Sequence, residues 1–284
     1  MAGVFKEIFT AIILSLFYPD GAWLNELTSM DHMVDNNTIN LSQVGADPQV
    51  VENNNVYPLT PTQRTDSGIA IPLATFDTLP THVTNVDELE TAYNKCESVA
   101  NQHVNSLRKV ASTSAAYNIS PASNTVNTPV LKTTGADRGD GKKRLTYGDM
   151  LKLRTAFNKG NLPITGRVLV LCPEHEEDLL LADADRYNRM MERGELSGFK
   201  VYTFTENALY DPATGQKQPK GAASGNESSF AFVKTEVMRA MGTIEGEPEK
   251  SWGQWRGWII GFQMRFVAMP FRNYGIGAIY SDNA

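Results

Sequence analysis

The stretch NVDELETAYNKCESVANQHVNSLRKVA, residues 85–111, carries the longest helical pattern in the chain and has no interior Gly or Pro. It opens with a capping box, in which Asn85 can accept a hydrogen bond from the amide of Glu88 while the Glu88 side chain reaches back. The pattern predicts one long helix of roughly 40 Å, at about 1.5 Å per residue. Mostly apolar side chains recur at spacings of three and four and so form a stripe along one face of this helix. They are Leu89, Tyr93, Cys96, Ala100, His103, Leu107 and Ala111.

The segments before this helix hold too few large apolar residues for a core of their own. Residues 1–55 become rich in Asn and Asp after an apolar start, and we interpret them as an arm that gains order from contact with something else. Residues 56–85 contain two short extended runs, Val56–Leu59 and Gly68–Leu73, which predict a long β-hairpin. An isolated two-stranded hairpin is marginally stable in water. We therefore expect the hairpin to rest on a partner.

The apolar run from Ile8 to Tyr18 follows Lys6 and has the general shape of a secretory signal. However, Glu7 lies beside it and no small-x-small cleavage site follows. The run is also shorter than the roughly 20 apolar residues that span a bilayer. We favour a segment that packs on the protein itself or on a neighbouring chain, with a secretory signal as the alternative.

After a polar connection at residues 112–145, helices and strands alternate to the end of the chain. Thr146 can cap a helix, and Pro173 can start another that continues towards Met191. We expect extended segments at Arg167–Cys172, Gly198–Phe204, Phe230–Thr235, Gly257–Ala268 and Gly275–Tyr280. This order predicts an α+β fold with a mixed sheet and two outlying extensions.

Composition restricts the function classes. The chain has 284 residues, 41% of them hydrophobic, and a formal net charge of −6. Its densest basic run is Lys142–Arg144, which argues against sequence-specific nucleic-acid binding but leaves loose contact with enclosed DNA open. Cys96 and Cys172 stand among apolar neighbours without CxxC spacing, so we interpret them as small buried hydrophobes in a reducing compartment.

The segment Cys172–Asp178, CPEHEED, brings several metal-ligand types together. His175 has no second His four residues away, and no HExxH pattern occurs in the chain. Glu174, Glu176 and Glu177 are the residues that the positive end of a helix favours. We therefore interpret the cluster as a helix start, with a metal or catalytic site as the alternative.

The chain shows no other catalytic or cofactor-binding pattern. Its four histidines accompany no nucleophile motif, and neither GxGxxG after a strand nor GxxxxGK[ST] occurs. His103 lies on the apolar helix stripe and is expected to be a packed structural histidine. We expect no enzyme activity, no cofactor and no metal.

Three tryptophans, Trp252, Trp255 and Trp258, recur every third residue. Exposed tryptophans at this spacing could bind sugars. Packing in the core or at a subunit interface is the commoner use of Trp, and we favour it.

The order of these parts resembles the major capsid proteins of tailed bacteriophages, the Hong Kong 97-type capsid fold family. Residues 76–95 are similar to the family's junction between hairpin and spine helix, where a D-T-x-x-T segment leads into E-x-x-x-x-Y-x-K. Residues 168–175 resemble the axial-domain strand with its Pro-started helix. Residues 196–202 resemble the following G-F-x-V-[YF] strand.

The resemblance implies a division into four parts. These are an N-terminal arm at 1–55, an extended loop (the β-hairpin) at 56–85, a peripheral domain with the spine helix at 86–145, and an α/β axial domain at 146–284 whose C-terminal strands return to the peripheral domain. Contacts between subunits are expected at Arg64, Asp66, Ile69, Ile71, Trp23 and Trp252.

The resemblance also implies a function and partners. The chain would assemble with itself, as hexamers and pentamers, into an icosahedral shell enclosing double-stranded phage DNA, with non-specific DNA contact and no membrane. Scaffold, portal and decoration proteins are further expected partners. Such a protein is part of the virion and is assembled in the host cytoplasm. The alternatives are an encapsulin-like nanocompartment shell and a secreted carbohydrate-binding or adhesin protein.

Overall fold

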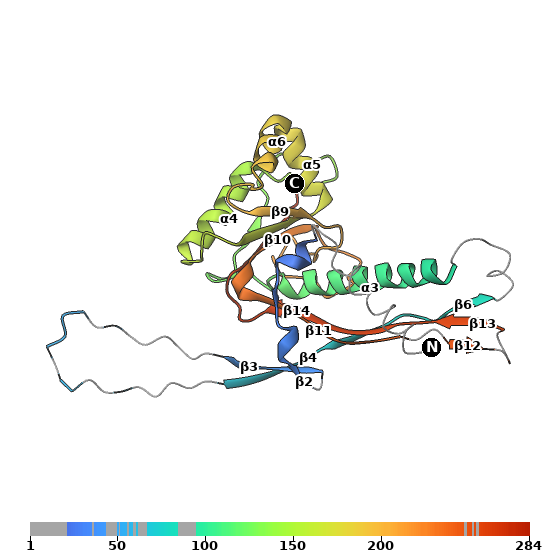
Figure 1. Ribbon diagram of the computed structural model, residues 1–284. Helices are drawn as coiled ribbons and strands as arrows, with labels where there is room; N and C mark the ends of the chain where they lie inside the picture. Colours follow the sequence, from blue (N-terminus) through green and yellow to red (C-terminus); the bar gives the residue numbers. More distant parts are fainter. Residues whose placement is uncertain are drawn as a thin grey trace.

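The computed structural model describes residues 22–35, 37–43, 50, 52–55, 57, 58, 61, 67–84, 95–246, 249–251, 253 and 256–284. In this part of the chain, two units are stacked on each other, and a pair of hairpin strands lies at the lower edge (Figure 1). The run Ile8–Tyr18 and the capping box at Asn85 lie outside the described residues, so these two expectations stay predictions.

The upper unit of Figure 1, here called the five-stranded unit, is built on a mixed sheet with the order β7-β15-β10-β8-β9. Strand β10 is antiparallel to β15 and β8, whereas β15 and β7, and β8 and β9, run parallel. The mixed sheet predicted from the sequence is thereby confirmed. Its strands are β7 (Val130–Lys132), β8 (Arg167–Leu171), β9 (Lys200–Thr203), β10 (Ser228–Val233) and β15 (Ile276–Tyr280).

This sheet is buried on both faces, because successive side chains of a strand point to opposite sides. Leu169, Leu171 and Val233 pack under the helices α4 and α5. Phe230 and Phe232 pack into a second core, which the sheet shares with the long helix α3. The near-continuous apolar runs in these strands follow from this double burial.

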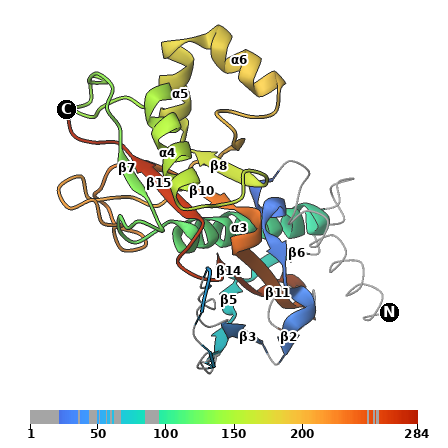
Figure 2. The ribbon, with the colours of Figure 1, turned by 90° about the vertical axis from the view of Figure 1, so that its left-hand side faces the viewer.

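Three helices cover the outer face: α4 (Tyr147–Lys159), α5 (Pro173–Ala182) and α6 (Ala184–Glu192) (Figure 2). Thr146 and Asp149 form a capping box at the start of α4, and Pro173 occupies the first turn of α5, as predicted. The expected single helix towards Met191 is wrong. The backbone of Asp183 is extended, and its side chain accepts a hydrogen bond from the amide of Arg186, which ends one helix and caps the next.

The lower unit, here called the long-helix unit, consists of α3 (Lys95–Ile119) lying on a four-stranded sheet with the order β1-β11-β14-β5. The buried stripe at Ala100, His103, Leu107 and Ala111 confirms this part of the predicted helix face. Leu89, Tyr93 and the side chain of Cys96 lie outside the described part of the chain. The helix ends at Ile119 rather than at Ala111 because small and apolar residues continue the stripe into the shared core. The strands are β1 (Thr28–Ser29), β5 (Ala74–Asp77), β11 (Val237–Glu245) and β14 (Gln263–Pro270).

A small sheet, β12-β13-β6, extends the long-helix unit at the end away from the hairpin. The single strand expected at Gly257–Ala268 is divided at Gly261 and Phe262, since its halves pair with different strands. The strands are β6 (Thr81–Thr84), β12 (Glu249–Ser251) and β13 (Gly257–Ile260).

The hairpin consists of β3 (Thr38–Gln43) and β4 (Ser67–Pro72), with β2 (Val34–Asp35) beside β3. The predicted first strand, Val56–Leu59, is wrong, because Tyr57 and Pro58 are outside any strand and β4 pairs with Thr38–Gln43 instead. The signal for the true strand is the alternation of polar and apolar residues in TINLSQ, hidden between Asn- and Asp-rich stretches.

Candidate assembly surfaces

The segment that joins β3 to β4 carries exposed apolar side chains. Val50 and Tyr57 in this segment are 92% and 76% exposed. Large apolar side chains at this exposure gain burial only from another surface. These residues are therefore the strongest candidates for contact with a second molecule.

The base of the hairpin is anchored on its own chain. Ile39 is fully buried and packs with Leu73 and Met238. Ile71 packs partly against the same cluster, so some of its surface is covered within the subunit. Ile69 lies in β4 opposite Leu41.

The other predicted interface residues are dispersed. Arg64, Asp66 and Trp252 lie outside the described residues. Trp23 is only 5% exposed and belongs to the core between the two units. Its indole ring is thus used inside the subunit, and sequence reasoning missed this because its partners are far along the chain.

The ends of α5 and α6 form a second exposed apolar surface, far from α3 in Figure 1. Leu179 is fully buried, whereas Leu181 is 62% exposed. Leu180 and Met191 are also exposed. Leu180, Leu181 and Met191 lie outside both the α4–α5 core and the core around α3.

His175, the centre of the metal-like motif, is fully buried between two serines. Its Nδ1 lies 2.7 Å from Ser229 Oγ, and its Nε2 lies 3.0 Å from Ser281 Oγ. The Ser281 hydroxyl donates to Glu227, so it must accept the hydrogen of His175 Nε2, which leaves Nδ1 as an acceptor for Ser229. Burial lowers the pKa of His175 to about 4. A histidine with this pKa and two occupied nitrogens is a poor general base near neutral pH.

Two acidic residues near His175, Asp178 and Glu227, belong to a buried ion-pair network, whereas Glu176 accepts hydrogen bonds from the hydroxyls of Tyr187 and Thr203. The guanidinium of Arg138 donates to both oxygens of Asp178, at 3.2 and 2.8 Å, and to Glu227 at 2.6 Å. Burial opposes the charge on Glu227, but hydrogen bonds from Lys142 and Arg138 outweigh it and lower its pKa to about 2. The network joins the loop at Arg138 to α5 and β10, so these charges hold the unit together.

Cys172 is buried and reduced, as the sequence predicts, and burial raises the pKa of its thiol. Within the described ranges, no three His, Cys, Asp or Glu side chains gather in a way that could hold a metal ion. Among the helices of that same part of the chain, none has the length and apolar character needed to cross a bilayer.

His103 is mostly buried, as expected from its place on the α3 stripe. Its Nε2 lies 2.9 Å from Thr81 Oγ1, and its ring meets Phe262 edge-on at 5.8 Å between centroids. Burial lowers its pKa. The residue links the helix to β6 and to the segment between β13 and β14.

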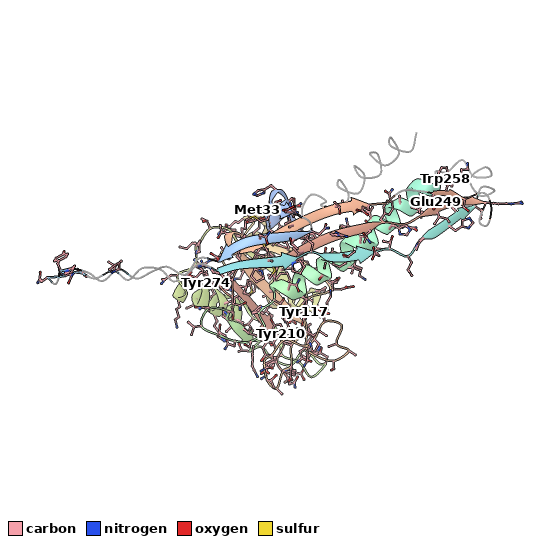
Figure 3. All side chains as sticks on the ribbon, turned by 90° about the horizontal axis from the view of Figure 1, so that it is seen from below. Met33, Tyr117, Tyr210, Glu249, Trp258 and Tyr274 are labelled. Atoms are coloured by element: carbon pink, nitrogen blue, oxygen red, sulfur yellow. The ribbon has the colours of Figure 1, made fainter. Side chains whose placement is uncertain are left out.

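Trp258 lies in β13 at the end of the molecule opposite the hairpin, near Glu249 (Figure 3). It packs partly against the main core, and the ammonium group of Lys250 lies 5.1 Å from the centre of its ring. Trp252 and Trp255 are outside the described residues. The expected packing is thus seen for Trp258, and it stays a prediction for Trp252 and Trp255.

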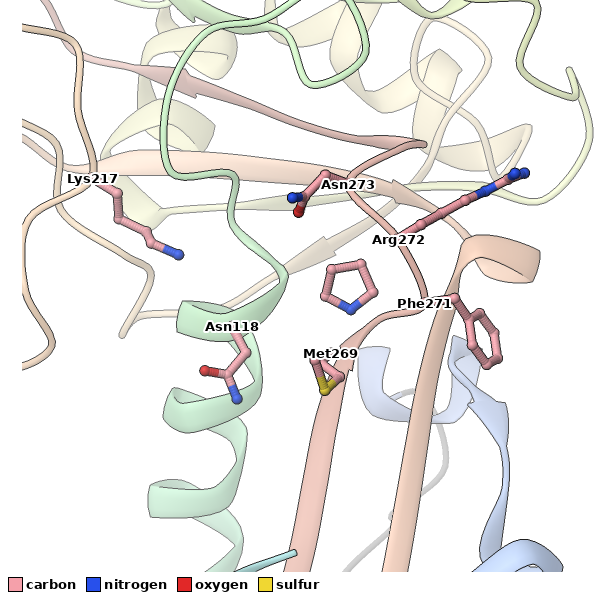
Figure 4. Close-up of a pocket in the computed structure, with 7 residues that line it drawn as sticks. Asn118, Lys217, Met269, Phe271, Arg272 and Asn273 are labelled. Atoms are coloured by element: carbon pink, nitrogen blue, oxygen red, sulfur yellow. The ribbon is translucent and has the colours of Figure 1, made fainter. Parts of the chain in front are cut away.

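Figure 4 shows a hollow of about 470 Å³ between the end of α3 and the turn that follows β14. The Lys217 ammonium group donates to the carbonyl oxygens of Tyr117 at 2.9 Å and Ser120 at 2.6 Å. Burial lowers its pKa to about 8. The charge of Lys217 thus stabilises the negative end of α3, which is a structural task.

The stacked units, the long helix α3 and the β3–β4 strands form an α+β fold of the Hong Kong 97 capsid type, as comparison with solved structures shows. No protein-family model and no curated protein matches the chain. The structure is similar to the capsid of the cyanophage P-SCSP1u, with a TM-score of 0.66 and 16% identity over 91% of this chain and 87% of that one.

Two further structures show the same fold. The mature capsid of bacteriophage PhiM1 matches with a TM-score of 0.64 and 12% identity, over 93% of this chain and 88% of that chain. The virus-like particle from Pyrococcus furiosus matches with a TM-score of 0.59 and 10% identity, over 96% and 98%. The similarity thus spans nearly whole chains, while the sequences have diverged almost completely.

Proposed function

We propose that this chain is the major capsid protein of a tailed phage, a non-catalytic subunit that assembles with itself into an icosahedral shell around double-stranded DNA. The observation that carries the proposal is the β3–β4 hairpin, with Val50 and Tyr57 exposed, on a body that has the capsid fold. Such a surface is an assembly element, since many weak symmetric contacts can close a shell.

We assign the parts of the shell subunit as follows. The five-stranded unit is the axial domain, which gathers around five-fold and six-fold axes. The long-helix unit is the peripheral domain, and α3 is its spine helix. The extended loop is the β3–β4 hairpin, which begins at Thr38 rather than at residue 56. Of the C-terminal strands, β11, β13 and β14 lie in the peripheral domain, while β15 joins the axial sheet.

The partners that we propose are other copies of this chain, in hexamers and pentamers, with scaffold, portal and decoration proteins as further candidates. Contact with packaged DNA is non-specific, consistent with a net charge of −6 and the absence of a dense basic run in the sequence. The protein is then a component of the virion that is assembled in the host cytoplasm.

An encapsulin-like nanocompartment shell, which the sequence resemblance leaves open, is the second candidate; the match to a virus-like particle over 98% of its chain fits either kind of shell. The two candidates differ in what the shell encloses. Particles captured from producing cells with an antibody against this chain are treated with nuclease and then opened. Protected double-stranded DNA supports the phage capsid, whereas a protein cargo without DNA supports the nanocompartment.

A further inference from the structure

One short segment of the predicted arm, residues 22–35, runs from the five-stranded unit past the long-helix unit to the base of the hairpin (Figure 1). It begins beside β10 as a 3-10 helix, η1 (Trp23–Glu26), and continues as β1 beside β11. A second 3-10 helix, η2 (Asp31–Met33), leads into β2 at the base of the hairpin. The segment therefore touches every main part of the subunit within fourteen residues, 22 to 35.

The first end of this segment is buried in the five-stranded unit. The Trp23 ring meets Phe230 at 5.3 Å, Phe204 at 5.8 Å and Phe232 at 6.4 Å between centroids, each time edge-on. Leu24 is only 2% exposed. Aromatic contacts of this geometry add to the hydrophobic gain of burial.

Glu26 fixes the segment beside this anchor. Its Oε1 accepts hydrogen bonds from Lys200 Nζ at 2.7 Å and Tyr202 hydroxyl at 2.5 Å, and its Oε2 forms an ion pair with Lys234. The carboxylate side chain is 9% exposed. Burial alone would raise the pKa of Glu26, but the hydrogen bonds from these three side chains lower it to about 2. The carboxylate stays ionised at neutral pH.

Lys234 lies at the place where the chain leaves one unit for the other. The short 3-10 turn η3 (Lys234–Glu236) connects β10 of the five-stranded unit to β11 of the long-helix unit. The Thr28 hydroxyl donates to the Lys234 carbonyl at 2.8 Å. The segment thus crosses beside a covalent connection between the units.

The second end of the segment is bound by backbone hydrogen bonds. Thr28 and Ser29 pair with β11, and the Met30 amide donates to the Arg239 carbonyl at 2.8 Å. The Asp31 carboxylate accepts from the Met241 amide at 2.7 Å. The segment then ends in β2, which pairs with β3 at the base of the hairpin.

We propose that residues 22–35 form a strap that sets the angle between the two units and the hairpin base, with Glu26 as its latch. Because both ends are bound to rigid sheets, a change at the five-stranded unit is transmitted to the hairpin through the strap. Releasing the latch loosens β1 and β2 from the strands that they pair with, while the core that the two units share stays packed. The proposal does not rest on the shell function, and it applies to the unassembled chain.

The test compares hydrogen exchange of the unassembled full chain in two matched variants. Glu26→Gln removes the latch charge. Glu206→Gln is the control, because Glu206 also ties the five-stranded unit to the long-helix unit, through Lys109 at 2.6 Å and Thr113 at 2.7 Å, but lies outside the strap.

We expect Glu26→Gln to raise exchange roughly ten-fold at β1, and also at the remote β2–β3 pairing, while the α4 and α5 amides stay protected. Glu206→Gln should leave β1 and β2–β3 unchanged. An increase confined to residues 22–27, or an equal increase in both variants, would overturn the proposal. If Glu26→Gln does not fold, Lys200→Met tests the same latch from its exposed partner, and unchanged exchange at β1 would again contradict the strap.

Discussion

The Nε2 atom of His175 lies 3.0 Å from the Oγ atom of Ser281, although 106 residues separate the two in the sequence. This contact joins the first turn of α5 to the residue that follows β15. The most motif-like stretch of the chain is therefore a buried joint of the five-stranded unit. Of the acidic residues near it, Asp178 and Glu227 form ion pairs with Arg138, and Glu174 and Glu176 lie in the first turn of α5.

The buried His175 predicts a loss of stability in mild acid. Its pKa in the folded protein, about 4, lies below the ordinary value of 6.5, so the unfolded chain binds the proton more readily. The contribution of neutral His175 to the free energy of unfolding is therefore fully present above about pH 6.5, and it is lost as the pH drops towards 4. At pH 4.5 the loss from His175 alone is about 2 to 3 kcal/mol. Urea unfolding at pH 7.5 and 4.5 measures it.

The matched variants for this prediction are His175→Gln and His103→Gln. Gln can still bond both serines but does not titrate in this range, so His175→Gln should lose most of the pH dependence between 6.5 and 4.5. His103→Gln should still lose the 2 to 3 kcal/mol, roughly, that protonation of His175 causes. If the free energy of unfolding depends equally on pH in the wild type and in His175→Gln, a group other than His175 takes up the proton.

Gly277 in β15 lies where α4 packs closely on the sheet, so a larger residue there should destabilise the protein. A Cβ atom there would lie 2.7 Å from Cε2 of Phe157 and 3.2 Å from Cδ1 of Leu153. Overpacking a buried site of this kind costs about 1 to 3 kcal/mol, so Gly277→Ala should lower the urea midpoint.

Gly148→Ala in the exposed first turn of α4 is the control, because only Thr146 Oγ1, at 3.5 Å, would contact the new methyl group. It should leave the midpoint unchanged or raise it, since Ala is a better helix former than Gly. If the two variants are equally stable, α4 does not approach β15 as described.

The exposed hairpin predicts a separation between folding and assembly. Val50→Ser should leave the free energy of unfolding within about 0.5 kcal/mol of wild type, because the side chain is 92% exposed. It should raise the protein concentration needed for assembly, as light scattering measures. Val126→Ser, at 88% exposure on another loop, is the matched control. If the wild type and both variants assemble at the same protein concentration, the exposed hairpin residue Val50 does not contribute to assembly.

The elements that sequence reasoning located correctly are those with local signals. Strand β8 is an unbroken apolar run, and Pro173 marks the start of α5 beside it. The end of α3 and the pairing of β4 with Thr38–Gln43 were missed, since both depend on long-range packing. Asp183 could have been recognised, because Asp is a favoured helix cap.

The interface residues were harder to predict than the fold. Trp23 stands in a polar arm, which suggested an intermolecular contact, but three phenylalanines from β10 and the end of β9 surround it. Val50 and Tyr57 carry no pattern that distinguishes them from core residues. Only the three-dimensional structure shows that no residue in the described part of the subunit covers these two side chains.

Electron microscopy of the purified protein, alone and with a candidate scaffold protein, shows whether the chain assembles into a shell. We expect closed icosahedral particles of megadalton mass, or hexameric and pentameric capsomers. A species that stays strictly monomeric under every assembly condition would contradict this expectation.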